Sequence, residues 1–144
     1  LLDHIHGVDL DSQAVEVTKL NLLLKCLEGE TSQTLGFEAK LFKERALPDL
    51  GNNILCGNSL IGTDIIGTDA WKEMSEEERT RVNPFDYERA FPKVFKGKGG
   101  GFDAVIGNPP YGASFGDTED SWFSKHFATY QGAQDVYVLF MEQA

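Results

Sequence analysis

The chain has 144 residues, of which 41% are hydrophobic and 25% are charged, and its formal net charge is −10 at pH 7. This length and composition are those of one ordinary globular domain, and no apolar run approaches the roughly 20 residues of a membrane span. A segment that held nucleic acid through its phosphates would normally be basic. The acidity therefore argues against nucleic-acid binding by this segment alone, although it leaves room for a catalytic lobe within a larger DNA-acting protein.

The cysteines and histidines suggest neither a disulfide nor a metal site. Cys26 and Cys56 each lie in an apolar run without a second cysteine nearby, so we interpret them as two buried, reduced thiols of a cytoplasmic protein. The three histidines lack the spacing of metal ligands, so no metal is predicted. The N-terminus shows neither the basic region nor the cleavage site of a signal peptide.

Residues 3–29 predict a strand, a turn and a helix. The strand is expected over residues 5–10, and either Asp11 or Ser12 can cap the helix that follows. Gly29 is a suitable end for this helix. The helix is expected to pack on a sheet, because apolar residues recur along it at helical spacing: Ala14, Val17, Leu20, Leu24 and Leu27.

The middle of the chain predicts one more strand and then a segment of different character. A polar connection with a short helix near residues 38–45 leads to a strand at 54–56, which ends in Gly57-Asn58-Ser59. Residues 63–100 are interpreted as an insertion with one charged, exposed helix over 71–82. The aromatic residues of its second half are expected to anchor the segment to the core, in preference to stacking on bases: Phe85, Tyr87, Phe91 and Phe95.

The last third predicts a third strand over 102–106, a loop, and a helix-rich stretch from residue 120 onward. Strands that alternate with helices indicate an α/β fold with a mostly parallel sheet and flanking helices. Ligands of such sheets bind beyond the carboxyl ends of the strands. Asp9, Asn58 and Asn108 each stand at the end of a predicted strand, so we expect a binding site there.

Two of these three polar residues are ambiguous by themselves. The Asp9 carboxylate can accept two hydrogen bonds from the cis-diol of a ribose, and Leu10 can lie on an adenine ring, but an exposed aspartate can equally be solvated. The Asn58 amide can meet the polar edge of adenine, but Gly-Asn-Ser is also ordinary turn chemistry.

The sequence Asn108-Pro109-Pro110-Tyr111 is more specific. Two successive prolines fix the backbone, hold Asn108 out of the helical region and leave carbonyl acceptors. The Asn108 side-chain oxygen and a proline carbonyl can together accept both hydrogens of an amine, while Tyr111 offers a ring face to a planar group. Such acceptors favour localisation of the lone pair of a conjugated amine and stabilise the positive charge that develops on transfer.

The segments GVDLD, CGNSL and NPPY, in this order and with NPFDYERAFPKVF and DVYVLFMEQA between and after them, resemble the N6-adenine DNA methyltransferase domains of Eco57I-type restriction–modification enzymes. The resemblance implies a Rossmann-like methyltransferase fold and the cofactor S-adenosyl-L-methionine. It assigns the ribose hydroxyls to Asp9 and the cofactor adenine to Leu10, Asn58 and Ser59. It assigns the target amine to Asn108 and the Pro109 carbonyl, with Pro110 in the same motif, and the flipped base to Tyr111.

The glycine-rich first loop of these enzymes is not found before Gly7. Residues 1–144 are therefore interpreted as a fragment of the methyltransferase domain, with a partial Rossmann-like fold. The isolated chain is expected to be inactive and to bind the cofactor weakly or not at all, with double-stranded DNA bound through the full-length parent. An exposed sheet edge is expected to favour self-association.

Two other classes of function remain open at this stage. A methyltransferase that acts on a protein glutamine or an RNA base would carry the same NPPY corner, although the long segment 63–100 favours the DNA family. A non-catalytic α/β interaction module would use the polar strand ends only as turns and caps, but a plain turn does not require both prolines and the aromatic residue.

Overall fold

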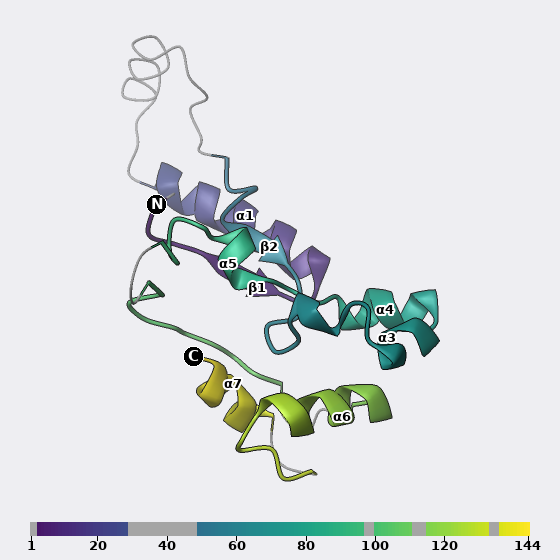
Figure 1. Cartoon of the computed structure of the whole chain (residues 1–144). Helices are drawn as coiled ribbons and strands as arrows, with labels where there is room; N and C mark the ends of the chain where they lie inside the picture. The colour runs from purple at the N-terminus through teal and green to yellow at the C-terminus, as the bar shows by residue number, and fades with distance from the viewer. Residues whose placement is uncertain (1–2, 29–48, 97–99, 111–114, 133–135) are drawn as a thin grey trace. The chain divides into compact units, whose positions relative to one another are not determined.

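A computed structural model describes residues 3–28, 49–96, 100–110, 115–132 and 136–144 (Figure 1). The chain divides into two compact units, Leu1–Cys56 and Gly57–Ala144. The first holds β1 (Gly7–Asp9), α1 (Ser12–Leu27) and β2 (Ile54–Cys56), and the second holds the 3-10 helix η1 (Thr63–Ile65), α3 (Asp69–Glu73), α4 (Glu76–Val82), α5 (Tyr87–Ala90), α6 (Asp117–His126) and α7 (Tyr137–Gln143). Within the described ranges, no helix is long and apolar enough to cross a membrane.

The first unit is a small β-α-β arrangement in which β1 and β2 pair in parallel, with Gly7 opposite Ile54 and Asp9 opposite Cys56. Asn53 is buried and ties the start of β1 to β2: its side-chain amide donates to the Ile5 carbonyl at 2.8 Å, and its own carbonyl accepts from the Gly7 amide at 2.8 Å. The predicted α/β class, with a parallel sheet and flanking helices, is confirmed for the described residues, and it is consistent with a partial Rossmann-like fold.

Helix α1 begins as predicted but buries a different face. Asp11 is the N-cap, accepting from the Gln13 amide at 2.8 Å. Val15 is buried and packs with Leu50 and Ile54, with Leu22 and Leu23 partly buried beside them. The residues that recur at helical spacing are instead exposed by more than half of their surface: Val17, Leu20 and Leu24. The apolar surface of α1 is broader than one face, and the two described strands cover only part of it (Figure 1).

The expectation of two buried thiols is wrong. Cys26 and Cys56 are both exposed, and neither is in a disulfide. Cys26 lies near the end of α1 among exposed residues, and Cys56 is the last residue of β2, where it donates a weak hydrogen bond to the Leu10 carbonyl at 3.4 Å. An apolar run along the chain does not by itself bury a side chain, because burial depends on what other segments pack against it.

Two helices of the second unit, α3 and α4, take the place of the single helix predicted over 71–82. Helix α3 ends before Met74, and Ser75 starts α4 with a reciprocal cap. The Ser75 hydroxyl accepts from the Glu78 amide at 3.2 Å, and the Glu78 carboxylate accepts from the Ser75 amide at 2.8 Å. These hydrogen bonds from Ser75 lower the pKa of Glu78. A local capping box therefore divides a stretch whose composition is helical throughout.

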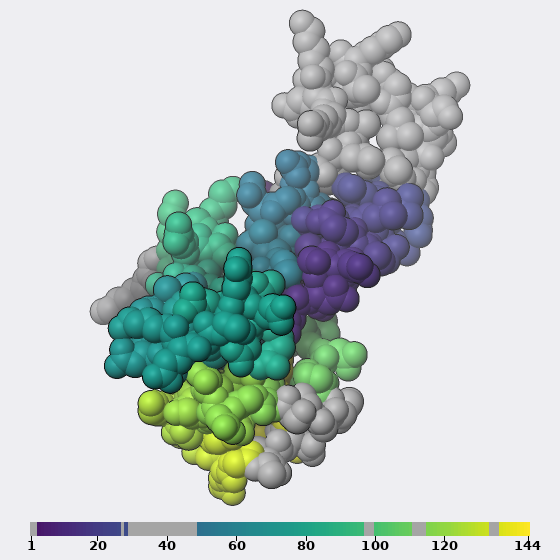
Figure 2. Space-filling model, turned by 90° about the vertical axis from the view of Figure 1, so that its right-hand side faces the viewer, coloured from purple at the N-terminus to yellow at the C-terminus, as the bar shows by residue number. Residues whose placement is uncertain are grey.

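The core of the second unit lies between helices from both ends of its sequence. Its most deeply buried members are Ile61, Ile65, Val82, Phe123 and Leu139. Figure 2 shows the teal surface of α3 and α4 against the yellow-green surface of α6 and α7. Across this boundary, Arg81 pairs with the buried Glu119 at 3.0 Å. The helix-rich C-terminal stretch predicted from residue 120 onward is present as α6 and α7.

A carboxylate near the C-terminus links stability to pH. Glu142 accepts from the Thr129 hydroxyl and from the amides of Thr129 and Ala128, and these bonds lower its pKa from the ordinary 4.5. A carboxyl whose pKa is depressed by folding stabilises the folded state above its unfolded pKa, and this stabilisation is lost as the pH falls through the folded value. The urea concentration at the midpoint of unfolding should therefore decrease as the pH is lowered below about 4.5.

Replacing Glu142 with glutamine should make that drop smaller, because the amide cannot titrate. The urea midpoint of each variant, measured at a series of pH values, tests this, with Glu73→Gln on the exposed side of α3 as the matched control. An unchanged pH profile in Glu142→Gln would show that other carboxyls govern the acid limb.

Candidate functional site

The carboxyl end of β1 presents a carboxylate and an apolar side chain together. Asp9 is exposed at the last position of the strand, and one of its oxygens accepts from the Asp11 amide at 2.8 Å. A carboxylate has further acceptor capacity, so this turn positions Asp9 and still leaves it able to bind a diol. Leu10 follows with half of its surface exposed. The end of β1 therefore presents the carboxylate of Asp9 and the apolar side chain of Leu10, the two residues that the sequence predicted at this strand end.

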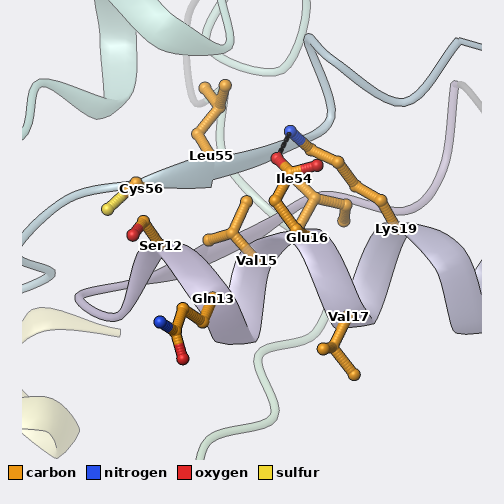
Figure 3. A pocket seen from close by; sticks show the side chains of 9 residues that line it. All are labelled: Ser12, Gln13, Val15, Glu16, Val17, Lys19, Ile54, Leu55 and Cys56. Carbon is orange, nitrogen blue, oxygen red and sulfur yellow. Dashed lines mark hydrogen bonds and ion pairs between the residues drawn. The ribbon is translucent and has the colours of Figure 1, made fainter.

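A shallow hollow of about 460 Å³ lies between the first turns of α1 and β2, and Figure 3 shows the nine side chains that line it. None of the predicted site residues is among them. Its charged groups, Glu16 and Lys19, pair with each other at 2.8 Å, and an exposed pair of this kind contributes about 1 kcal/mol at most. The two charged groups among the described lining residues neutralise each other, so we do not assign the hollow a function.

Asn58 performs the turn role and keeps further hydrogen-bonding capacity. Its side-chain oxygen accepts from the Leu60 amide at 3.0 Å, and its backbone amide donates to the Asn83 carbonyl at 2.8 Å. An amide side chain has two donor hydrogens and a second lone pair on the oxygen. The turn and the binding interpretations of Asn58 are therefore compatible, because the turn orients the side chain without using its full capacity.

Ser59 contacts a residue that sequence reasoning treated only as an anchor. Its side chain forms a hydrogen bond with the phenol of Tyr87, and burial raises the pKa of Tyr87 while this bond opposes the rise. The segment DYER carried no signal for this contact, because the two residues lie far apart in the sequence. Tyr87 thus belongs to the surroundings of the predicted cofactor residues Asn58 and Ser59.

A second hollow, of about 250 Å³, includes Ser59 among its lining residues. The others are Leu60, Gly62, Asp64, Phe85, Tyr87, Trp122, His126, Phe127 and Gln143. The His126 ring stacks on Trp122 with centroids 3.5 Å apart, and its Nε2 lies 3.3 Å from an Asp64 carboxylate oxygen. The lining combines aromatic faces with polar edges. In the described part of the chain, no three His, Cys, Asp or Glu side chains gather as metal ligands would.

The predicted third strand is absent from the described residues. Residues 102–106 form no ladder, and Val105 and Ile106 are exposed by 59% and 99% of their surface. An apolar strand of a parallel sheet is held by hydrogen-bonding neighbours and covered on both faces, and the described sheet consists of β1 and β2 alone. The prediction of a strand over residues 102–106 is therefore wrong, although these residues have the apolar composition of a strand.

The described residues of the NPPY corner, Asn108, Pro109 and Pro110, lie on irregular backbone. Asn108 and Pro110 are exposed and Pro109 is half-buried, while Tyr111 lies outside the described residues. Asp9 and Leu10 belong to the first unit, and Asn58, Ser59 and Asn108 to the second. Within the second unit, the structure brings Ser59 to Tyr87, and it holds Phe102, shortly before Asn108, in a cluster of aromatic rings.

Comparison with known proteins identifies relatives along almost the whole chain. Residues 3–144 match the family described as Eco57I restriction-modification methylase. The type II restriction enzyme and methyltransferase RM.Eco57I of Escherichia coli is 34% identical over 146 residues, which cover 97% of this chain and 12% of that protein. RM.MjaORFECS2P of Methanocaldococcus jannaschii is 42% identical over 59 residues, 41% of this chain and 5% of that protein. The chain thus spans a small part of these relatives, and no solved structure matches it significantly.

Proposed function

Because the chain belongs to the Eco57I restriction-modification methylase family, we propose that it is part of a DNA methyltransferase that modifies the N6 amine of adenine. The observation that carries this proposal is the sequence Asn108-Pro109-Pro110-Tyr111 within a match that extends over residues 3–144. RM.Eco57I is itself described as a restriction enzyme and methyltransferase. Adenine is proposed as the target base because the motifs resemble those of N6-adenine DNA methyltransferases, and the corner has the acceptors and the aromatic residue that its amine and ring require.

We further propose S-adenosyl-L-methionine as the methyl donor, held in part by the ends of β1 and β2. The Asp9 carboxylate is exposed and positioned by its bond from the Asp11 amide, which fits the ribose hydroxyls. Leu10 has exposed apolar surface for the adenine ring, and Asn58 and Ser59 are proposed at the polar edge of that ring. When bound, this cofactor supplies an electrophilic methyl group.

The chain's own contribution to the chemistry is to prepare the nucleophile. The Asn108 side-chain oxygen and the Pro109 carbonyl are proposed to accept the two N–H bonds of the target amine. These acceptors draw the nitrogen toward tetrahedral geometry and localise its lone pair, and they stabilise the positive charge that develops on it. Because the amine keeps its protons until after transfer, no strong general base is needed beside it.

Double-stranded DNA is the proposed partner, and the target adenine has to leave the duplex to reach an amine-binding corner. Tyr111 is assigned to stack on the flipped base. With a net charge of −10, this segment is not proposed to grip the DNA backbone, which requires basic surface. A cytoplasmic location is proposed on the same family grounds. Self-association through a sheet edge stays a prediction.

A methyl-transfer assay on the product of the complete coding sequence tests this function. DNA, RNA and protein acceptors are offered in parallel with S-adenosyl-L-methionine carrying a labelled methyl group, and labelled DNA is digested to nucleosides. The proposal expects label in DNA alone, recovered as N6-methyldeoxyadenosine. Label in RNA or protein, or on another base, would overturn the assignment of substrate, and no transfer to any acceptor would favour a non-catalytic module.

The role of Asp9 predicts a loss of cofactor affinity. Asp9→Asn keeps an acceptor for the Asp11 amide but removes the charge, and hydrogen bonds to charged groups contribute about 1.5–3 kcal/mol. The dissociation constant for S-adenosyl-L-methionine should therefore rise about tenfold or more, measured by calorimetric titration of the complete protein. Asp69→Asn, on the exposed surface of α3, is the matched control and should bind like the unsubstituted protein. Equal affinities in the two variants would remove Asp9 from the cofactor site.

A further inference from the structure

Phe102, shortly before the NPPY corner, is held by three aromatic rings. Its ring centroid lies 6.5 Å from that of Tyr87, 5.9 Å from that of Phe91 and 5.5 Å from that of Phe95, with interplanar angles of 80°, 73° and 87°. Edge-to-face pairs at these separations are the favoured geometry for aromatic rings. Residues 100–110 have no strand neighbours in the described part of the chain. The ring contacts of Phe102 therefore hold this segment in place of the hydrogen bonds of a sheet.

The rings that hold Phe102 form one cluster, which we call the aromatic cluster: Phe85, Tyr87, Phe91, Phe95 and Phe102. Phe85 meets Tyr87 edge-on at 5.0 Å and lies 6.0 Å from Phe91. Tyr87 begins α5 and Phe91 is its C-cap; the Phe91 amide donates to the Tyr87 carbonyl at 2.8 Å, and the two ring centroids lie 6.4 Å apart. Asp86 caps this helix by accepting from the Arg89 amide at 2.9 Å.

The same cluster is joined to the segment that carries Asn58 and Ser59. The Phe85 amide donates to the Ile61 carbonyl at 2.9 Å, and the Asn58 amide donates to the Asn83 carbonyl at 2.8 Å. The Ser59 side chain is hydrogen-bonded to Tyr87. One group of rings therefore contacts both the residues proposed for the cofactor and the backbone that leads to Asn108.

Two glycines make this packing possible. A Cβ atom at Gly57 would lie 2.3–2.8 Å from atoms of Phe85, and one at Gly100 would lie 2.7–2.9 Å from the backbone of Phe95. The neighbouring Gly101 has nothing within 4 Å of the same position. Close approach of the chain at Gly57 and Gly100 thus depends on the absence of a side chain.

From these contacts we infer that the aromatic cluster sets the position of the Asn108 segment relative to Asn58 and Ser59, which makes Phe102 a positioning residue for methyl transfer. The inference rests on the proposed function, because it concerns the distance between donor and amine. Misplacement of reacting groups by about 1 Å can cost on the order of 10²-fold in rate even when binding is retained. Phe102 therefore acts on kcat through Asn108 without touching substrate.

The test uses the product of the complete coding sequence and compares Phe102→Leu with Phe140→Leu. Phe140 is partly buried and packs on the core of the second unit, outside the aromatic cluster. Phe102→Leu is expected to lower kcat on the order of 10²-fold with the dissociation constant for S-adenosyl-L-methionine and the KM for DNA unchanged. Phe140→Leu should leave kcat unchanged. Phe102→Tyr, which keeps the ring at a position where 36% of the residue is exposed, should restore most of the rate.

A glycine pair guards against a folding defect in the Phe102 variant. Gly100→Ala should lower kcat because its Cβ displaces Phe95, and Gly101→Ala should not. Full kcat in both Phe102→Leu and Gly100→Ala would overturn the inference, as would a parallel loss of cofactor binding in Phe102→Leu and Phe140→Leu. Methyl transfer by the unsubstituted protein distinguishes a failure of the proposed function from a failure of the positioning role. If the unsubstituted protein transfers no methyl group, the proposed function fails, and the positioning role fails with it.

Discussion

Replacing Asn108 with alanine in the product of the complete coding sequence should lower kcat for methyl transfer by about 10²–10³-fold, the loss typical of removing one preorganised polar contact to a transition state. The side chain is exposed, so the substitution should leave the fold intact. The dissociation constant for S-adenosyl-L-methionine should remain unchanged, because Asn108 is assigned to the target amine. Single-turnover rates with DNA and calorimetric titration with the cofactor measure the two quantities separately.

Asn21→Ala is the matched control for this substitution, since Asn21 is also exposed but lies on α1. It should leave both rate and affinity unchanged. If Asn108→Ala weakened cofactor binding as much as it slowed transfer, Asn108 would belong to the cofactor site and the proposed role of the NPPY corner would be wrong.

Replacing Phe123 with alanine should lower the free energy of unfolding by about 3–5 kcal/mol, the range for removing a buried aromatic side chain. Phe123 is 1% exposed, and its ring meets those of Phe115, Phe127 and Tyr130 at centroid distances of 4.9, 6.0 and 5.9 Å. Domains are stable by only about 5–15 kcal/mol, so the loss is a large share of the total. Urea denaturation followed by far-UV circular dichroism measures it.

The control for Phe123 is another apolar residue of the same unit that the core does not cover. Met141, on α7, is 73% exposed, and Met141→Ala should change the free energy of unfolding by no more than about 0.5 kcal/mol. Similar losses in the two variants would mean that the packing of α6 and α7 differs from that described.

Features with a local cause were predictable from the sequence. The Asp11 cap depends on residues two positions apart, and β2 was predicted at its observed bounds because a short apolar run is followed by Gly-Asn-Ser. The aromatic residues of 83–95 were predicted to anchor that segment to the core, but the structure shows them packed on one another and on Phe102. The family and its motifs could likewise be recognised from residues in order along the chain.

Features that depend on a distant neighbour were not predictable. The periodicity of α1 indicated Val17, Leu20 and Leu24, but Val15 faces the strands. Residues 102–106 have the composition of a strand but no ladder partner among the described residues. The bond between Ser59 and Tyr87 joins segments that no spacing rule connects.

The sequence by itself determined the β-α-β order of the first unit, the Asp11 cap and the residues of the NPPY corner, because helix starts, turns and proline geometry are set by neighbours along the chain. Only the tertiary structure decided which apolar faces are covered, which thiols are exposed and which rings hold Phe102. Burial and ring packing depend on what another segment brings to the same place, and positions along the chain do not reveal which segment that is.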